Sequence, residues 1–240
     1  MGSTKEILVT VISYAHEVIL LKTRKTAGTS VELWLSSIAG PKDVVTEMDP
    51  GDEHMRASMG GRIQNCSIPR RRYRLADYAR ELGGGRRQFV SHMRASEVRR
   101  YVGERVWKSF LKVTIERDPY ERAVSMYRFK TRDMPEPPGL VEFLRRFPAY
   151  KLANAPIYKI DGEIVADVVL DYANLRDDIA TLQRYLGVPP SPLPRAKAFN
   201  NPARDGRALL GVEGCRIVDT VCKYDVALAV PAKRVGMLFR

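Results

Sequence analysis

Cysteine is scarce in this chain, and long apolar runs are missing from it. The 240 residues include only three cysteines, with no CxxC pair among them: Cys66, Cys215 and Cys222. This excludes a disulfide framework and a cysteine-based zinc cluster, and it is typical of a reducing compartment. No stretch approaches the roughly 18 apolar residues that a membrane-spanning helix needs, and the N-terminal residues carry no small-residue cleavage site. We therefore expect a cytoplasmic protein with neither a signal peptide nor a membrane span.

Several nucleotide-binding and nucleic-acid-binding motifs are also missing. The nucleoside triphosphatase pattern GxxxxGK[ST] does not occur, and there is no zinc finger, RNP-like aromatic strand or bZIP heptad pattern. No repeat with a period of roughly 20 to 50 residues is visible, which excludes a solenoid. What is present is 45% apolar and 28% charged residues. This composition predicts one folded domain, residues 1–240, with a sizeable core.

Positive charge is the first feature that points to a partner. Lysine and arginine number 40 against 28 acidic residues, a formal net charge of +12. Residues 62–105 hold twelve arginines, no lysine and four acidic residues, a local balance of +8. Arginine recognises phosphate, sulfate and carboxylate groups with two parallel hydrogen bonds. The excess therefore indicates either a nucleic acid or a small ligand with several phosphates, although a solvated basic face would have the same composition.

Strand-like and helix-like segments alternate along the chain. Short β-branched and apolar runs predict strands, and helical spacing with capping residues predicts helices. The predicted strands are 18–22, 110–115 and 164–171, the predicted helices are 31–38, 75–82, 95–103, 118–129, 175–186 and 214–227, and 41–61 is predicted as loop. This alternation is typical of an α/β fold in three layers, with a central, mostly parallel sheet flanked by helices.

The turn after the first predicted strand has the features of an anion site. Residues Lys25 to Ser30 (KTAGTS) offer consecutive backbone N–H groups, small residues and hydroxyls at the start of a helix, where the helix dipole favours negative charge. Lys25 adds a mobile cation. A simple helix cap after a strand would look similar. Because the lysine precedes the glycine and no acidic partner for magnesium stands out, we do not expect a triphosphate kinase.

A second candidate site follows the strand at 110–115. Arg117 stands at the C-terminal end of that strand, where open α/β sheets bind ligands. Ser125 lies on the helix that begins after Asp118 and Pro119, so strand end and helix face could hold one phosphate together. Alternatively, Arg117 pairs with Glu121 or caps a helix. Two phosphate-sized sites at two strand ends indicate a nucleotide with phosphates at both ends.

The two motifs together resemble those of sulfotransferases that use PAPS (3'-phosphoadenosine 5'-phosphosulfate). The sequence is most similar to bacterial members of the carbohydrate-type group. The resemblance extends to residues 91–97 (SHMRASE), 167–175 (DVVLDYANL) and 193–197 (LPRAK), in the same order along the chain. It covers roughly residues 18–228, and it is weakest between 41 and 85.

The resemblance implies a P-loop-like fold and the transfer of a sulfuryl group from PAPS to an acceptor hydroxyl, without a metal. It also implies Lys25 beside the bridging oxygen, the 3'-phosphate on Arg117 and Ser125, and His92 as the general base. Lys197, Arg204 and Arg207 are candidates for a phosphate clamp. The residues expected to bind the donor are Arg24, Lys25, Thr26, Ala27, Gly28, Thr29, Ser30, Arg117, Ser125, Lys197 and Arg204.

The sequence departs from this family at two positions. Asp118 stands where the family often has asparagine, so its carboxylate must cap a helix to be compatible with a phosphate site. Ala173 replaces an acidic residue. The acceptor stays open among glycans, lipids and small metabolites, and residues 62–105 could contact it or form a lid. The alternative functions are a basic nucleic-acid-binding protein and, less favoured, a small-molecule kinase that uses ATP.

Overall fold

The computed structural model describes residues 11–83, 86–90, 92–194, 196 and 205–225. Its central element is a five-stranded sheet with the strand order β3-β1-β2-β4-β7. Those strands are β1 (Val11–Ser13), β2 (Val18–Leu21), β3 (Val44–Val45), β4 (Leu111–Glu116) and β7 (Val168–Asp171). The pairs β2–β4 and β4–β7 are parallel, whereas β1 is antiparallel to both β2 and β3. Four of the five strands therefore run in one direction, and the predicted mostly parallel sheet is confirmed.

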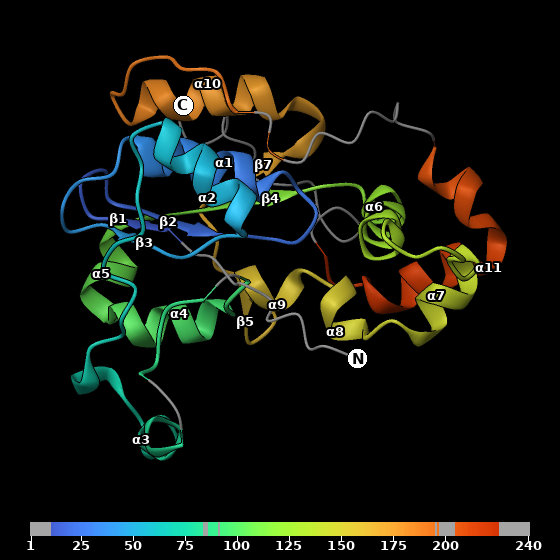
Figure 1. Ribbon diagram of the computed structural model, residues 1–240, viewed down its shortest axis with the longest axis horizontal. Coiled ribbons are helices and arrows are strands. Elements are labelled where there is room, and N and C mark those ends of the chain that lie inside the picture. Colours follow the sequence, from blue (N-terminus) through green and yellow to red (C-terminus); the bar gives the residue numbers. More distant parts are fainter. Residues whose placement is uncertain (1–10, 84–85, 91, 195, 197–204, 226–240) are drawn as a thin grey trace.

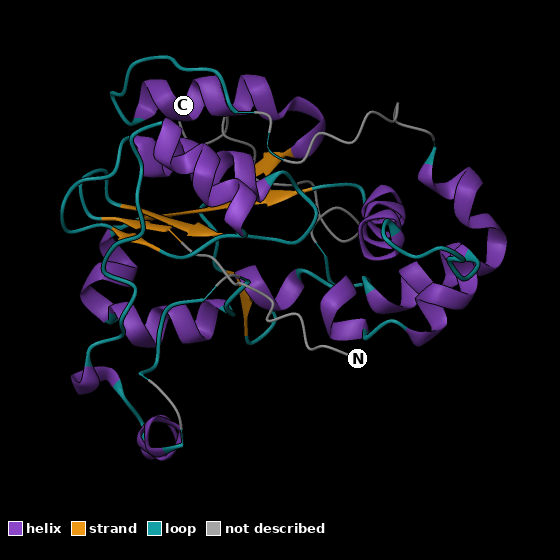
Figure 2. Cartoon of the chain, viewed as in Figure 1, coloured by secondary structure: helices purple, strands orange, loops and turns teal. Residues whose placement is uncertain are grey.

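Helices cover both faces of this sheet (Figures 1 and 2). Residues in β2 alternate between two apolar clusters: Val18 and Leu20 pack with α1 (Gly28–Ser37) and α10 (Leu175–Tyr185), while Ile19 and Leu21 pack with α4 (Ala95–Val102) and α5 (Glu104–Ser109). A strand with a period of two places successive side chains on opposite faces. Because both faces are buried, β2 is apolar at every position, as expected for a parallel-sheet core.

A third apolar cluster lies beside the sheet and is formed by helices alone. It joins α6 (Pro119–Thr131), α7 (Leu140–Arg146), α8 (Ala149–Leu152) and α11 (Gly206–Val221), which lie together at the right of Figure 1. The remaining described elements are α2 (Pro50–Ser58), α3 (Leu75–Leu82), α9 (Ala155–Tyr158), the 3₁₀ turns Arg70–Arg72 and Tyr172–Asn174, and a hairpin of β5 (Lys159–Ile160) with β6 (Glu163–Ile164).

Three sequence-based assignments were wrong. The predicted loop at 41–61 contains β3 and α2; its composition concealed ordinary helix-start signals, namely Pro50 at the first helical position and acidic residues in the first turn. The predicted strand at 164–171 is two strands in different sheets. The last helix begins at Gly206 rather than 214, because Asp205 caps it and Gly211 interrupts it with a φ of 62°.

Within the described part of the chain, no helix combines the length and the apolar character needed to cross a bilayer. The same residues contain no group of three histidine, cysteine or acidic side chains arranged to hold a metal ion.

Candidate functional site

The candidate site lies along one edge of the sheet, at the C-terminal ends of three parallel strands. β2 leads into the turn that ends at α1, β4 leads to Arg117, and β7 leads to Tyr172. The hydroxyl of Thr114 donates to the carbonyl oxygen of Leu21 at 2.8 Å, and the Thr23 hydroxyl donates to the carbonyl oxygen of Ile115. These bonds between β2 and β4 fix the register, so the two sequence motifs meet at the edge where such sheets bind ligands.

The turn after β2 presents backbone N–H groups in an unusual backbone conformation. Lys25 and Ala27 have left-handed φ angles of 61° and 59°, each of which costs a non-glycine residue on the order of 1 kcal/mol. Within the described residues, the amides of Thr26, Ala27, Gly28 and Thr29 have no hydrogen-bond acceptor. Since these amides surround the N-terminus of α1, the turn has the chemistry of an anion-binding site.

A second cation, Lys22, lies over the same helix terminus. Its ammonium group contacts Glu32 Oε2 at 2.8 Å and Thr29 Oγ1 at 3.4 Å. A Cβ atom on Gly28 would lie 2.7 Å from Lys22 Cγ, so glycine is required there by the close approach of this side chain. Glu32 is fully buried and also pairs with Arg56 at 3.1 Å. No local sequence pattern predicts this role, because Lys22 resembles only the end of a strand.

One row of residues on α6 connects the two motifs. Glu121, Ser125 and Phe129 are four residues apart and therefore share a helix face. The guanidinium of Arg117 contacts Glu121 at one end of this row, and the ammonium of Lys25 lies 4.0 Å from the ring centroid of Phe129 at the other. With a rise of 1.5 Å per residue, Glu121 and Phe129 are about 12 Å apart along the helix axis. Ser125 lies between the two cations.

Arg117 forms the ion pair that the sequence analysis gave as the alternative to phosphate binding. Its Nε and Nη2 atoms both lie 3.1 Å from Glu121 Oε2, and the guanidinium carbon lies 4.2 Å from the ring centroid of Tyr172. Nη1 takes no part in this pair. A phosphate at Arg117 would therefore share the guanidinium with Glu121 or displace it.

Asp118 caps α6, as the sequence analysis required. Its Oδ1 atom accepts hydrogen bonds from the amides of Tyr120 and Glu121, each at 2.9 Å. The carboxylate is therefore engaged with the helix N-terminus, where negative charge is favourable.

His92 lies next to the turn after β2, although it is 70 residues away in sequence. Its Nδ1 atom is 2.8 Å from the carbonyl oxygen of Lys22. A carbonyl oxygen only accepts, so Nδ1 carries the proton and the neutral ring keeps a lone pair on Nε2. Burial, followed by the charges of Arg24 and Lys22, lowers the pKa of His92 well below 6.5. The ring is therefore neutral at pH 7, with Nε2 able to accept a proton.

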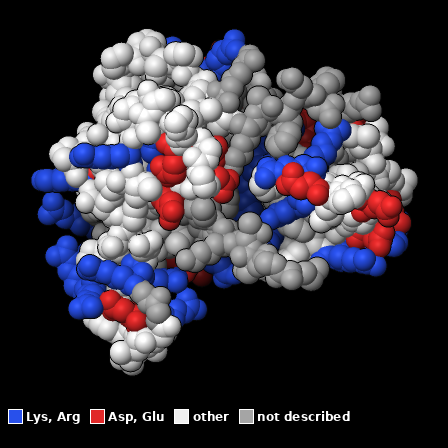
Figure 3. Space-filling view, in the orientation of Figure 1, with Lys and Arg blue, Asp and Glu red and all other residues white. Residues whose placement is uncertain are grey.

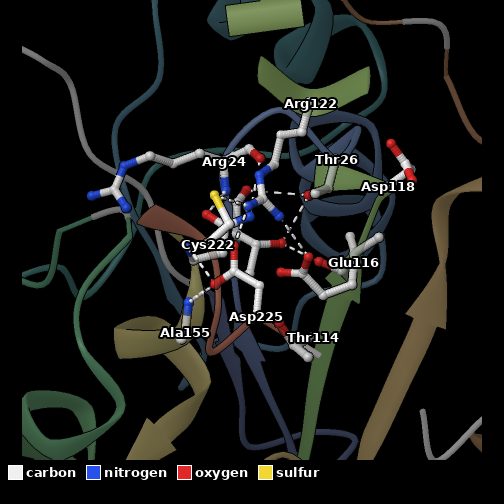
Figure 4. A network of polar contacts seen from close by, with 12 residues as sticks. Arg24, Thr26, Thr114, Glu116, Asp118, Arg122, Ala155, Cys222 and Asp225 are labelled. Carbon is white, nitrogen blue, oxygen red and sulfur yellow. Dashed lines mark hydrogen bonds and ion pairs between the residues drawn. The ribbon is translucent and has the colours of Figure 1, made fainter. Parts of the chain in front are cut away.

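A buried ionic network lies beneath the turn (Figure 4). Arg122, which is fully buried, contacts Glu116 Oε2 at 2.7 Å through Nη1 and Asp225 Oδ2 through Nη2. Burial raises the pKa of Glu116 to about 7, although the charge of Arg122 opposes that shift. Arg122 thus joins the end of β4 to the residues that follow α11.

Asn154 connects this network to the turn. Its side-chain Oδ1 accepts from the amide of Arg24 at 2.9 Å, and its Nδ2 donates to the carbonyl oxygen of Arg24 at 3.2 Å. The backbone amides of Asn154 and Ala155 in turn donate to Asp225 Oδ1, at 3.0 and 2.6 Å. The backbone at Arg24 is therefore tied to the core through Asn154 and Asp225.

The structure places only one of the three candidates for a phosphate clamp. Lys197 and Arg204 lie outside the described residues. Arg207 stacks on Tyr120, with 3.7 Å between its guanidinium carbon and the ring centroid, so it lies at the start of α6. The amide of Ala196 is 3.4 Å from the hydroxyl of Ser30, so Ala196 lies beside the start of α1.

The structure therefore brings together residues 24–30, His92, Arg117 and Ser125. Lys22, Asn154 and Tyr172 also belong to the site, and no local sequence pattern predicts their contacts. No protein-family model matches the chain, and no curated protein or solved structure gives a significant match.

Proposed function

We propose that this protein transfers a sulfuryl group from PAPS to an acceptor hydroxyl and releases 3'-phosphoadenosine 5'-phosphate (PAP). The observation that carries the proposal is the row on α6, which places Ser125 between the cations Lys25 and Arg117 at the edge formed by β2 and β4. Two separated cationic positions suit a nucleotide that carries phosphate at its 5' and 3' ends.

In this proposal the turn after β2 is P-loop-like and binds the 5'-phosphosulfate. The amides of residues 26–29 hydrogen-bond its oxygens, and Lys25 and Lys22 supply positive charge. Arg117 and Ser125 bind the 3'-phosphate. The contacts of Asn154 with Arg24 keep the turn in its strained conformation, so the amides need no reorganisation when the donor binds.

The reaction is an in-line displacement at sulfur. The acceptor oxygen forms a new S–O bond while the bond between sulfur and the bridging phosphate oxygen breaks, and that electron pair stays on the 5'-phosphate. Lys25 and the aligned amides stabilise the charge that grows on this oxygen. His92 Nε2 takes the acceptor proton. Negative charge on the bound donor raises the pKa of His92 toward the range a general base needs.

The test is calorimetric titration with PAP in magnesium-free buffer at two salt concentrations, with ATP as the control ligand. We expect micromolar binding of PAP that ATP does not reproduce. Absence of PAP binding would overturn the proposal. If DNA or RNA bound tightly instead, with an affinity that falls steeply with salt, the chain would be a basic nucleic-acid-binding protein.

A further inference from the structure

Helix α3 turns its polar side toward the protein and its apolar side toward solvent. Successive helical residues are 100° apart, so Leu75, Tyr78, Ala79 and Leu82 share one face and Asp77 lies opposite. Leu75 and Leu82 are 89% and 91% exposed, whereas Asp77 is 5% exposed. A surface helix ordinarily buries its apolar stripe against the core. Helix α3 instead exposes its apolar stripe and buries a carboxylate.

Polar contacts of Asp77 hold the helix in this orientation. Its carboxylate accepts from the amide of Arg74 at 2.9 Å and from the hydroxyl of Tyr101 at 3.2 Å, and it lies 3.6 Å from both Arg87 and Arg100. Burial opposes ionisation, but these hydrogen bonds and guanidinium groups keep the pKa of Asp77 below its ordinary value. The anchor is therefore charged at neutral pH.

A second contact restrains the apolar face. The Tyr78 hydroxyl donates to the carbonyl oxygen of Arg70 at 3.1 Å, and its ring packs edge-on against Tyr73 with 5.1 Å between centroids. Tyr78 still exposes 44% of its surface. Helix α3 cannot bury its leucines by rotating without breaking both sets of contacts.

Several exposed arginines lie near this apolar face. We call residues 70–83 the α3 arm; it projects from the body of the molecule at the lower left of Figure 1. Figure 3 shows basic side chains, with acidic side chains among them, between the uncharged tip of this region and the body of the molecule. The exposed arginines on the arm and beside it are Arg70, Arg71, Arg74, Arg80 and Arg86. Of these, Arg70 pairs with Glu81 at 2.9 Å.

We propose that the α3 arm docks on an anionic phospholipid surface. Leu75 and Leu82 would enter the boundary between headgroups and acyl chains, with Tyr78 at headgroup level, while the arginines contact lipid phosphates. Such a surface has negatively charged headgroups for the arginines and apolar acyl chains for the leucines of the arm. A second copy of the same face would instead place arginines against arginines, so charge complementarity favours lipid over self-association.

The test is sedimentation of the full chain with vesicles of phosphatidylcholine alone or with 30% phosphatidylserine. We expect at least tenfold stronger binding to the anionic vesicles, and at least a tenfold loss in a Leu75→Ser, Leu82→Ser double variant. Val212→Ser is the matched control, because Val212 is an 80% exposed apolar residue on α11. Its vesicle binding should equal that of the original chain, and thermal unfolding checks that all variants fold.

A second pair of variants tests the charge. Arg71→Gln with Arg74→Gln should weaken binding to anionic vesicles, whereas Arg145→Gln with Arg146→Gln, on α7, should not. Equal binding to both vesicle types, or full binding by the leucine variant, would overturn the proposal. So would a dimer that forms without lipid and is lost with the leucines, because a second copy would then cover the face.

Discussion

His92 donates a hydrogen bond through Nδ1 to the carbonyl oxygen of Lys22, the residue that leads from β2 into the candidate anion-binding turn. This bond places an imidazole beside that turn and determines which ring nitrogen can act as a base. The ring stays neutral because burial and the charges of nearby cations disfavour the imidazolium ion, although the hydrogen bond to Lys22 opposes that shift.

Replacing His92 should separate donor binding from transfer. In His92→Gln the side-chain amide can still donate to Lys22, but no group accepts the acceptor's proton. We expect turnover to fall by about 100- to 10,000-fold with PAP affinity unchanged, measured by a sulfuryl-transfer assay and by calorimetry. His54→Gln, on α2, is the control. Retained turnover would point to another base.

His92 should also make the folded state sensitive to acid. Its pKa is lower in the folded protein than the 6.5 of an exposed histidine, so below about pH 6.5 the unfolded chain binds more protons. The free energy of unfolding should therefore decrease as the pH falls from about 6.5. Urea unfolding at several pH values should show a smaller decrease in His92→Gln. Identical pH dependence in both proteins would contradict the assigned shift.

Lys25 should matter for turnover far more than for stability. Its ammonium lies over the partly exposed ring of Phe129, and a contact of this kind is worth about 1 kcal/mol. If Lys25 stabilises charge on the bridging oxygen, Lys25→Ala should lower turnover by about 100-fold or more. Lys42→Ala, at an exposed position, should change neither quantity. Normal turnover in Lys25→Ala would remove this residue from the site.

Arg122 should contribute strongly to the stability of the folded protein. Arg122→Met leaves the buried carboxylates of Glu116 and Asp225 without their cation, and breaking a buried pair in this way costs about 3–5 kcal/mol. Urea denaturation should show a correspondingly lower free energy of unfolding. Arg146→Ala removes an exposed partner of Glu142 and should leave the urea midpoint unchanged. Equal effects of the two substitutions would contradict the structural role of the network.

Local patterns in the sequence predicted the parts of the fold that depend on local chemistry. The apolar run of β2, the cap and proline that start α6, and the glycine stop after α3 all lie within a few residues of what they specify. The antiparallel strands β1 and β3 are only three and two residues long. Strands this short are too short to show the two-residue alternation from which a strand is predicted, and pairing with neighbours in the sheet stabilises them.

The motifs of the candidate site could be predicted from the sequence, but the residues that hold those motifs in place could not. Residues 25–30 and Arg117 belong to recognisable strand ends. Asn154 contacts Arg24, 130 residues away in sequence, and Asp225 contacts Arg122, 103 residues away. A single sequence contains no information on which residues pair over such separations. Chain folding alone brings these residues together.

The most direct test of the central claim is a binding cycle with two ligands and two proteins. PAP and AMP, which lacks the 3'-phosphate, are titrated calorimetrically into the original chain and into Arg117→Ala, with Arg145→Ala as the control variant. A charged hydrogen bond is worth about 1.5–3 kcal/mol, so Arg117→Ala should bind PAP roughly 10- to 150-fold more weakly and bind AMP like the original chain. Equal losses for both ligands, or no loss for PAP, would contradict the assignment of the 3'-phosphate to Arg117.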